Sequence, residues 1–225
     1  IADRSRRRSP RRAFRIEPLE TRALLATFTV TSNADSGAGS LRNMISLAND
    51  TVGPDLIAFS PSTNGIEFDL SSTSMSIAGS LTITGNGAAV TVIDAQQMSQ
   101  IFDIKNTAVN VTISNVTLKN GRTTGTNGTV DNEFSGGAIR SNLTGTLTIN
   151  QSTLSGNRTT GANANGGAIY SATGAVVINQ STLSGNSTSG ATSTGGAITS
   201  LSGAISVNGS TISGNSTTGN LGYGG

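Results

Sequence analysis

The sequence predicts an all-β fold: a right-handed parallel β-helix (solenoid) with about 29–30 residues per coil and one N-terminal capping helix. The first observation is a repeat, because residues 136–157, 166–186 and 195–215 share the pattern GGAI…STLSGN or a close variant. The second is spacing, since equivalent apolar positions in these copies recur every 29 residues. The third is a series of short β-type runs separated by Gly, Ser and Asn turns. A unit this small buries its apolar face only by stacking on similar units, and parallel crossovers are nearly always right-handed.

The same repeat predicts a ladder of asparagines. Asn157, Asn186 and Asn215 occupy one position of the repeat. Stacking places their side-chain amides one rung apart, where they can hydrogen-bond to each other. The alternative is a flexible linker rich in Gly, Ser, Thr and Asn. A linker does not explain why the apolar residues keep their register across three copies.

The chain is expected to have three segments, and its charge distribution separates the first from the other two. These are a basic leader at 1–26, a strand with a capping helix at 27–50, and β-helix repeats at 51–225 that stop within a repeat, which predicts further coils. Residues 1–27 carry eight Arg against three acidic residues, a net charge of +5, whereas the remainder carries −3. The coils therefore offer no electrostatic footprint for nucleic acid. Nucleic-acid binding through residues 4–12 is the least favoured hypothesis. The chain has no Cys, which excludes disulfides and thiolate sites.

The segment 27–50 is expected to start the fold. Phe28 and Val30 alternate with Thr, which predicts a short strand. Ser40 is a suitable N-cap for a helix that ends at Asn49-Asp50. The apolar residues of this helix share one face: Leu41, Met44, Ile45 and Ala48. A helix ahead of the strands covers the first rung, whose unpaired backbone groups would otherwise favour aggregation.

The earlier coils follow the same plan with a less regular sequence. Apolar clusters recur about every ten residues after the helix, so that three clusters make one coil. Ile83 and Ile113 are 30 residues apart, and one longer step of 36 leads to Ile149. Residues 121–135 are about seven residues longer than their equivalents in the later coils. This insertion predicts one longer loop on one side of the solenoid, where function is often found.

Several segments resemble known families. The clusters and GGAI repeats over roughly residues 28–225 resemble the right-handed parallel β-helix (pectin-lyase-like) superfamily. The pairing of GGAI with LSGN is similar to the repeats of polymorphic outer-membrane proteins, although Leu or Ile stands where that family has Phe. The strand–turn–helix at 27–50 resembles the segment ahead of the repeats in CSLREA-type bacterial surface proteins. FRIEPLETRALLA at 14–26 resembles the LEPR-XLL segment. Together these resemblances imply an exported protein, secreted or at the cell surface (outer membrane).

The expected role is non-catalytic, as a structural, adhesin-like surface protein without a cofactor or metal site. The expected partners are surface glycans or cell-surface proteins, with association to the outer membrane or cell envelope through a part beyond residue 225. Five charged residues near the longer loop are the binding candidates: Asp103, Lys105, Asp131, Glu133 and Arg140. Surface charges on turns are the simpler explanation of the same residues.

The alternative function is a polysaccharide lyase or glycoside hydrolase of the pectin-lyase-like superfamily, with its active site mostly beyond the chain end. Hydrolases of this kind need paired carboxylates, and the family signatures, one of which contains His, are missing from a chain that has no His. A lyase needs a Lys or Arg base beside carboxylate-bound Ca²⁺. Ca²⁺ is expected only under this alternative, for which Asp94, Lys119 and Arg122 are further candidates.

Overall fold

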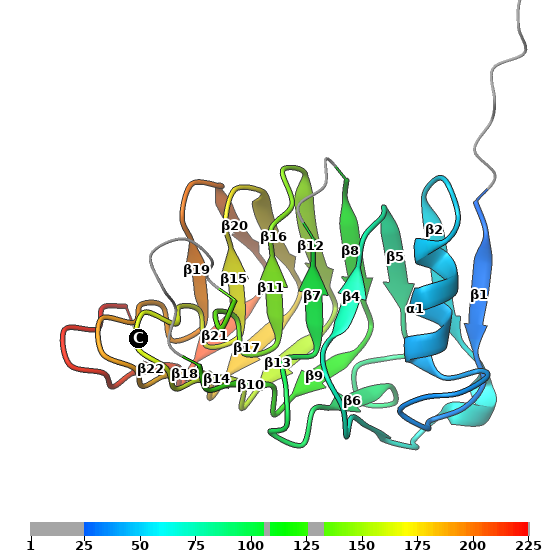
Figure 1. Cartoon of the computed structure of the whole chain (residues 1–225), viewed down its shortest axis with the longest axis horizontal. Helices are drawn as coiled ribbons and strands as arrows, with labels where there is room; N and C mark the ends of the chain where they lie inside the picture. The colour runs from blue at the N-terminus through cyan, green and yellow to red at the C-terminus, as the bar shows by residue number, and fades with distance from the viewer. Residues whose placement is uncertain (1–24, 106–108, 126–132, 225) are drawn as a thin grey trace, which may run out of the picture.

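The protein folds as a stack of parallel strands. The computed structural model describes residues 25–105, 109–125 and 133–224 and shows a β-solenoid of about six turns, all of whose sheets are parallel, with one α-helix. Figure 1 shows the rungs side by side along the long axis, with the helix at the N-terminal end. The predicted solenoid fold is confirmed.

Four sheets form the walls. The first contains β1 (Thr27–Val30), β2 (Asp55–Phe59), β5 (Leu81–Thr84), β8 (Val111–Ser114), β12 (Thr146–Asn150), β16 (Ala175–Asn179) and β20 (Ile205–Asn208). The second contains β3 (Phe68–Asp69), β6 (Val92–Asp94), β9 (Thr117–Lys119), β13 (Thr153–Ser155), β17 (Thr182–Ser184) and β21 (Thr211–Ser213). The third contains β4 (Met75–Ile77), β7 (Phe102–Ile104), β11 (Ile139–Ser141), β15 (Ile169–Ser171) and β19 (Ile198–Ser200). The fourth contains β10 (Arg122–Thr123), β14 (Arg158–Thr159), β18 (Ser187–Thr188) and β22 (Ser216–Thr217). Outside the sheets, a 3₁₀ turn, η1 (Pro61–Thr63), follows β2.

The core consists of columns of apolar side chains that run from coil to coil. One column of the first sheet pairs, in order, Ile57, Ile83, Ile113, Ile149, Ile178 and Val207. The second sheet contributes Phe68, Ile93, Leu118, Leu154, Leu183 and Ile212. All of these side chains are buried except those of the last coil. Burying one such side chain stabilises the fold by roughly 1.5–3 kcal/mol.

The length of a coil varies more than the repeat predicts. Ile57 pairs with Ile83, a step of 26 residues, which is shorter than the expected 29–30. The predicted 36-residue step is present, because Ile113 pairs with Ile149. Arg122 pairs with Arg158 at the same step. The extra residues therefore lie after β10 and before β11, and 126–132 among them are outside the described residues.

Helix α1 (Leu41–Asn49) forms as expected. The Ser40 hydroxyl accepts a hydrogen bond from the backbone N–H of Asn43 at 3.2 Å, and the four predicted apolar residues are buried. The helix packs against β1, β2 and β4. Strand β1 pairs in parallel with β2, so the first predicted strand is itself a rung of the first sheet.

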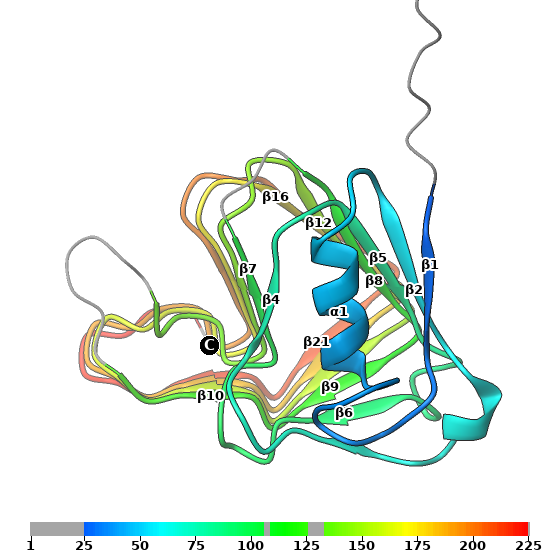
Figure 2. The same cartoon turned by 45° about the vertical axis from the view of Figure 1, so that its right-hand side comes forward.

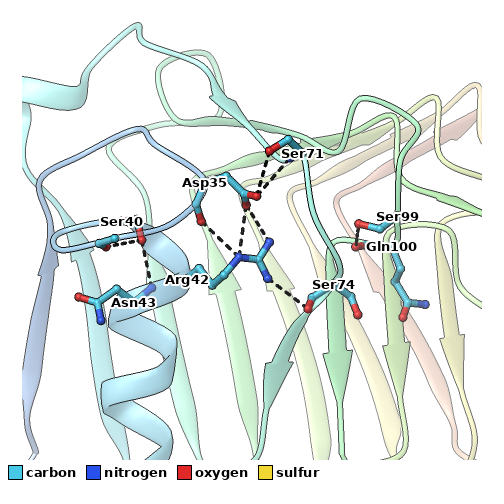
Figure 3. Close-up of polar contacts among 9 residues, drawn as sticks. Asp35, Ser40, Arg42, Asn43, Ser71, Ser74, Ser99 and Gln100 are labelled. Atoms are coloured by element: carbon cyan, nitrogen blue, oxygen red, sulfur yellow. Dashed lines mark hydrogen bonds and ion pairs between the residues drawn. The ribbon is translucent and has the colours of Figure 1, made fainter.

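An ion pair fastens this cap to the first coil. Arg42 Nη2 and Nε donate to Asp35 Oδ1 at 2.7 and 3.3 Å, and Arg42 Nη1 donates to the Ser74 carbonyl at 3.3 Å. Figure 3 shows the guanidinium between Asp35 and Ser74, with Ser71 donating to the same carboxylate. Burial opposes ionisation of Asp35, but hydrogen bonds from Ser72 and Arg42 outweigh it and lower its pKa. The loop before the helix, the helix and the turn before β4 are thus held together.

The fourth sheet departs from the sequence expectation. Residues 121–135, expected to form the longer loop, begin next to the two-residue strand β10, and the equivalent segments of the later coils begin with the two-residue strands β14 and β18. Figure 2 shows this sheet and its turns as a side lobe that projects from the main cross-section. Strands of two residues are too short to show an alternating pattern. They form because each pairs with its counterpart in the adjacent coil.

Paired glycines join the side lobe to the third sheet. Gly166 has φ +70, in the left-handed region that favours glycine. A Cβ on Gly167 would lie 2.0 Å from the Gly196 carbonyl oxygen and 2.6 Å from the Ser187 backbone nitrogen. The GGAI motif is therefore required by the turn and by the close approach of two backbones.

Candidate functional site

The structure brings together three of the five predicted binding residues. Asp103 on β7 and Arg140 on β11 are register partners, and Arg140 Nε donates to Asp103 Oδ1 at 2.9 Å. The Lys105 ammonium bonds the other carboxylate oxygen. Burial opposes ionisation of Asp103, but hydrogen bonds from Arg140 and Lys105 outweigh it, so the pKa of Asp103 is lowered. The ion pair of Asp103 with Arg140 therefore joins one coil to the next.

The other two predicted residues are not part of this cluster. Glu133 is exposed in a turn and forms no ion pair with the residues that the structure describes. Asp131 lies outside the described residues. A low pKa also makes Asp103 a weak base at neutral pH. The observed arrangement is therefore that of a link between rungs, and no substrate-facing carboxylate pair is formed by it.

A second charged cluster lies on the second sheet, and sequence reasoning found only half of it. Asp69, Asp94 and Lys119 follow one another in register on β3, β6 and β9. Glu67 precedes β3, and carboxylate oxygens of Glu67, Asp69 and Asp94 all lie within 4.8 Å of one another. Glu67 and Asp69 were missed, although Asp69, Asp94 and Lys119 are each 25 residues apart in the sequence. A period of 25 would have revealed Asp69, whereas Glu67 lies outside this spacing.

Lys119 offsets part of the charge of this acidic cluster. Its ammonium contacts Glu67 Oε1 and lies 3.2 Å from Asp94 Oδ2. The hydrogen bond to Glu67 is the main reason why the pKa of Lys119 is raised. A raised pKa disfavours the neutral amine that a lysine base requires. A Ca²⁺ ion at these carboxylates would also need Lys119 to move, because like charges repel.

Asp94 is the most extensively bonded member of this cluster. Its Oδ1 accepts from the Gln96 backbone N–H at 2.7 Å, and Asn120 Nδ2 donates to both carboxylate oxygens at 2.9–3.0 Å. Burial raises the pKa of Asp94, but these bonds, with Lys119, outweigh it and lower the pKa overall. The carboxylate therefore stays ionised and is hydrogen-bonded to Gln96 in its own coil and to Asn120 in the next.

The predicted asparagine positions form continuous hydrogen bonds inside the later coils. Asn157 Nδ2 donates to Asn186 Oδ1 at 3.0 Å, and Asn186 Nδ2 donates to Asn215 Oδ1 at 2.9 Å. Each of these oxygens also accepts from the backbone N–H of the preceding asparagine in the column, at 3.0 and 2.9 Å. Asn157 and Asn186 are fully buried. We call this column the inner ladder.

A second column of asparagines lies on the outside of the first sheet, at residues that the sequence analysis did not single out as a ladder. Asn179 Nδ2 donates to Asn150 Oδ1 at 2.8 Å, and Asn208 Nδ2 donates to Asn179 Oδ1 at 2.9 Å. The three residues have the repeat spacing of 29, so the same reasoning applied to them would have found this outer ladder. It belongs to a wall without charged side chains on its outer face.

The comparisons with known proteins add no relative. No family model matches the chain, and neither the search of curated proteins nor that of solved structures gives a match. Among the described residues, no helix has the length and apolar character needed to cross a membrane. The solenoid architecture therefore rests on the observed strand topology.

Proposed function

We propose that this protein is an exported, non-catalytic, adhesin-like β-solenoid that acts as a rigid support at the cell surface. The observation that carries the proposal is the ladder chemistry of the later coils, where each rung is bonded to the next through buried and exposed asparagines. Such nearest-neighbour bonding produces a stiff, extended element. The surface location, secreted or in the outer membrane, is proposed from the resemblances of 14–26 and 27–50.

The outer face of the first sheet supports a binding role. Its half-exposed outward side chains in three successive coils carry only neutral polar groups: Thr82, Thr84, Thr112, Ser114, Thr148 and Asn150. Hydroxyl and amide groups both donate and accept hydrogen bonds, as do the hydroxyls of sugars. We therefore propose surface glycans or glycosylated surface proteins as partners.

A second candidate function is a carbohydrate lyase, which the cluster of Glu67, Asp69 and Asp94 beside Lys119 favours. Carboxylates and a cationic side chain are the groups that a Ca²⁺-assisted lyase uses. Activity at this cluster would require Lys119 to leave its two acidic partners. For this reason we rank it below the non-catalytic role.

One experiment separates the two candidates. The whole chain is applied to a glycan array and to cells, and it is also incubated with polyuronates with and without Ca²⁺. We expect retention on glycans or cells without release of unsaturated products. Ca²⁺-dependent product formation would favour the lyase, and absence of both binding and products would contradict the proposed binding role.

A matched pair of variants locates the binding surface. Thr112→Lys with Thr148→Lys places two charges on the outer face of the first sheet and should abolish retention on neutral glycans. Thr153→Lys with Thr182→Lys places two charges on the outer face of the second sheet, at paired positions of similar exposure. This control should still be retained, and equal loss in both variants would argue against the first sheet as the binding face.

A further inference from the structure

Two arginines lie in direct register in the side lobe. Arg122 on β10 pairs with Arg158 on β14, which places their Cα atoms about 5 Å apart across the parallel pair. The next residues, Thr123 and Thr159, are buried inside the lobe, whereas both arginines are half-buried and lie on its outer side. Two positive charges are therefore held side by side.

These arginines differ from the other cations of the described chain. Arg42, Lys105, Lys119 and Arg140 each form an ion pair with a carboxylate. Within the described ranges, neither Arg122 nor Arg158 forms one. Arg158 Nη2 donates a hydrogen bond to Gln97 Oε1. The Nε atoms of both arginines are buried and have no hydrogen-bond partner.

This arrangement is unfavourable unless a further group completes it. Like charges directly opposite each other destabilise a sheet, and a buried donor without an acceptor costs free energy. The planar guanidinium forms paired hydrogen bonds with carboxylate, phosphate and sulfate oxygens. One such oxyanion between Arg122 and Arg158 would accept from both and offset their repulsion.

The rest of the column suits an anion as well. Arg158 pairs with Ser187, and Ser187 pairs with Ser216, so that two half-buried hydroxyl positions continue the line of the arginines. The sequence after Arg158 has no acidic residue that would repel a negative ligand. The column thus presents two cationic donors followed by two neutral ones.

We infer that Arg122 and Arg158 form an oxyanion-binding site for the sulfate ester or carboxylate groups of an acidic glycan. The inference adds to the proposed glycan-binding role a second site, on the fourth sheet, that is specific for acidic glycans, and in that respect it rests on the proposed function. Free sulfate or phosphate shares the recognised chemistry. The site itself does not require surface display, so its test is separate.

The first measurement is thermal unfolding of the whole chain in sodium sulfate and in sodium chloride of equal ionic strength. A ligand that binds only the folded protein raises the melting temperature. We expect sulfate to stabilise the wild type more than it stabilises R122Q/R158Q, since general sulfate effects act on both chains. The double variant in chloride should be at least as stable as the wild type, because the repulsion is removed. Equal sulfate effects in the two chains would overturn the inference.

The second measurement compares glycans and controls for the basic leader. Binding of a sulfated polysaccharide, a polyuronate and a neutral dextran is measured for the whole chain. We expect R122Q/R158Q to bind the acidic glycans at least about tenfold more weakly, and dextran not to distinguish the chains. R6Q/R7Q removes the same number of charges from the leader. Its melting temperature should still be higher in sulfate than in chloride by as much as that of the wild type.

The outcomes separate the sources of the anion. Stabilisation by sulfate that R122Q/R158Q loses, without any glycan binding, supports the site and excludes the glycan as its ligand. Glycan binding that R6Q/R7Q loses and R122Q/R158Q keeps assigns binding to the leader and overturns the inference. If sulfate stabilises the wild type but the chain is not retained on cells, the result supports the oxyanion site and contradicts the proposed adhesin-like role.

Discussion

The early and the late coils build the same fold with different chemistry. From β2 to β9 the coils step by 26 and 30 residues along the first sheet and contain the clusters around Asp94 and Asp103. From β11 onward the step is about 29 residues, and no charged residue follows Arg158. In the early coils charged side chains join the rungs, whereas asparagine amides do so in the late coils.

The difference follows from what each side chain can pair with. An asparagine amide is both donor and acceptor, so the same residue repeated at one position bonds to itself along the stack. A charged residue repeated at one position repels its own copy. Charged links therefore need opposite charges on adjacent rungs, as in Asp94 with Lys119 and Asp103 with Arg140. Regular repeats favour neutral ladders. The like-charged pair Asp69–Asp94 has Lys119 beside it, whereas Arg122–Arg158 has no opposite charge within the described residues and therefore calls for a ligand.

The largest predicted effect concerns the inner ladder. Asn186→Ala removes bonds to Asn157 and Asn215 and to the Leu154 carbonyl, all at 2.9–3.0 Å in a buried column. Leaving these partners unsatisfied should destabilise the protein by about 3 kcal/mol. Chemical denaturation followed by circular dichroism measures the change.

The outer ladder provides the matched control for this variant. Asn179 in the same coil bonds to two asparagines but is half-exposed. Water replaces these bonds, so that Asn179→Ala should cost about 0.5–1 kcal/mol. Equal losses for the two variants would show that burial does not distinguish the ladders.

The second effect tests the paired glycines of the late coils. In Gly167→Ala the added Cβ meets backbone atoms that cannot rotate away, which should cost about 2–3 kcal/mol. Gly79 in an early coil has no atom within 4 Å of an added Cβ. Gly79→Ala should therefore change stability by less than about 0.5 kcal/mol. A tolerated Gly167→Ala would mean that the side lobe can move away from the third sheet.

The third effect concerns the cap on the early coils. Arg42→Ala removes the bonds to Asp35 and Ser74 and should weaken the cap by roughly 1.5 kcal/mol. Hydrogen exchange should quicken in α1 and β1 while the amides of β16 and β17 keep their rates, because coils contact only their neighbours. Asn43→Ala is the control on the same helix. Faster exchange along the whole chain would contradict a local role.

The smallest effect is a pH dependence confined to the early half. Asp35, Asp94 and Asp103 have lowered pKa values, so their stabilisation is complete above the ordinary aspartate pKa of about 4 and is lost as the pH falls through the lowered values. Lys119 contributes at the alkaline end of the pH range. Because its pKa is raised, its stabilisation is present at lower pH and is lost only when the pH rises through that raised pKa.

Regional hydrogen exchange at mildly acid pH measures this dependence. Protection should fall below about pH 4 in the coils that contain these aspartates, and the coils after Arg158, which have no carboxylate side chain, should keep theirs. Asp103→Asn should flatten the response around β7 and β11. An acid response of equal size in both halves would be inconsistent with the assignment of the charges.

The sequence by itself determined the solenoid, the capping helix and the inner ladder. Each follows from a regular spacing: 29 residues for the late coils and their asparagines, and one helical face for the buried residues of α1. Stacking converts equal spacing directly into contact. The pair Arg122–Arg158 has the same origin, since its spacing of 36 equals that of Ile113 and Ile149.

Only the tertiary structure decided where irregular coils bring side chains together. Glu67 meets Asp94 and Lys119 because a short coil brings the residue before β3 beside later strands, and no repeat position encodes that contact. The two-residue strands of the side lobe likewise exist only through pairing with adjacent coils. Spacing predicts contacts where every coil has the same length. Where the lengths differ, the route of the chain between strands decides which residues pair. That route depends on how the whole fold packs.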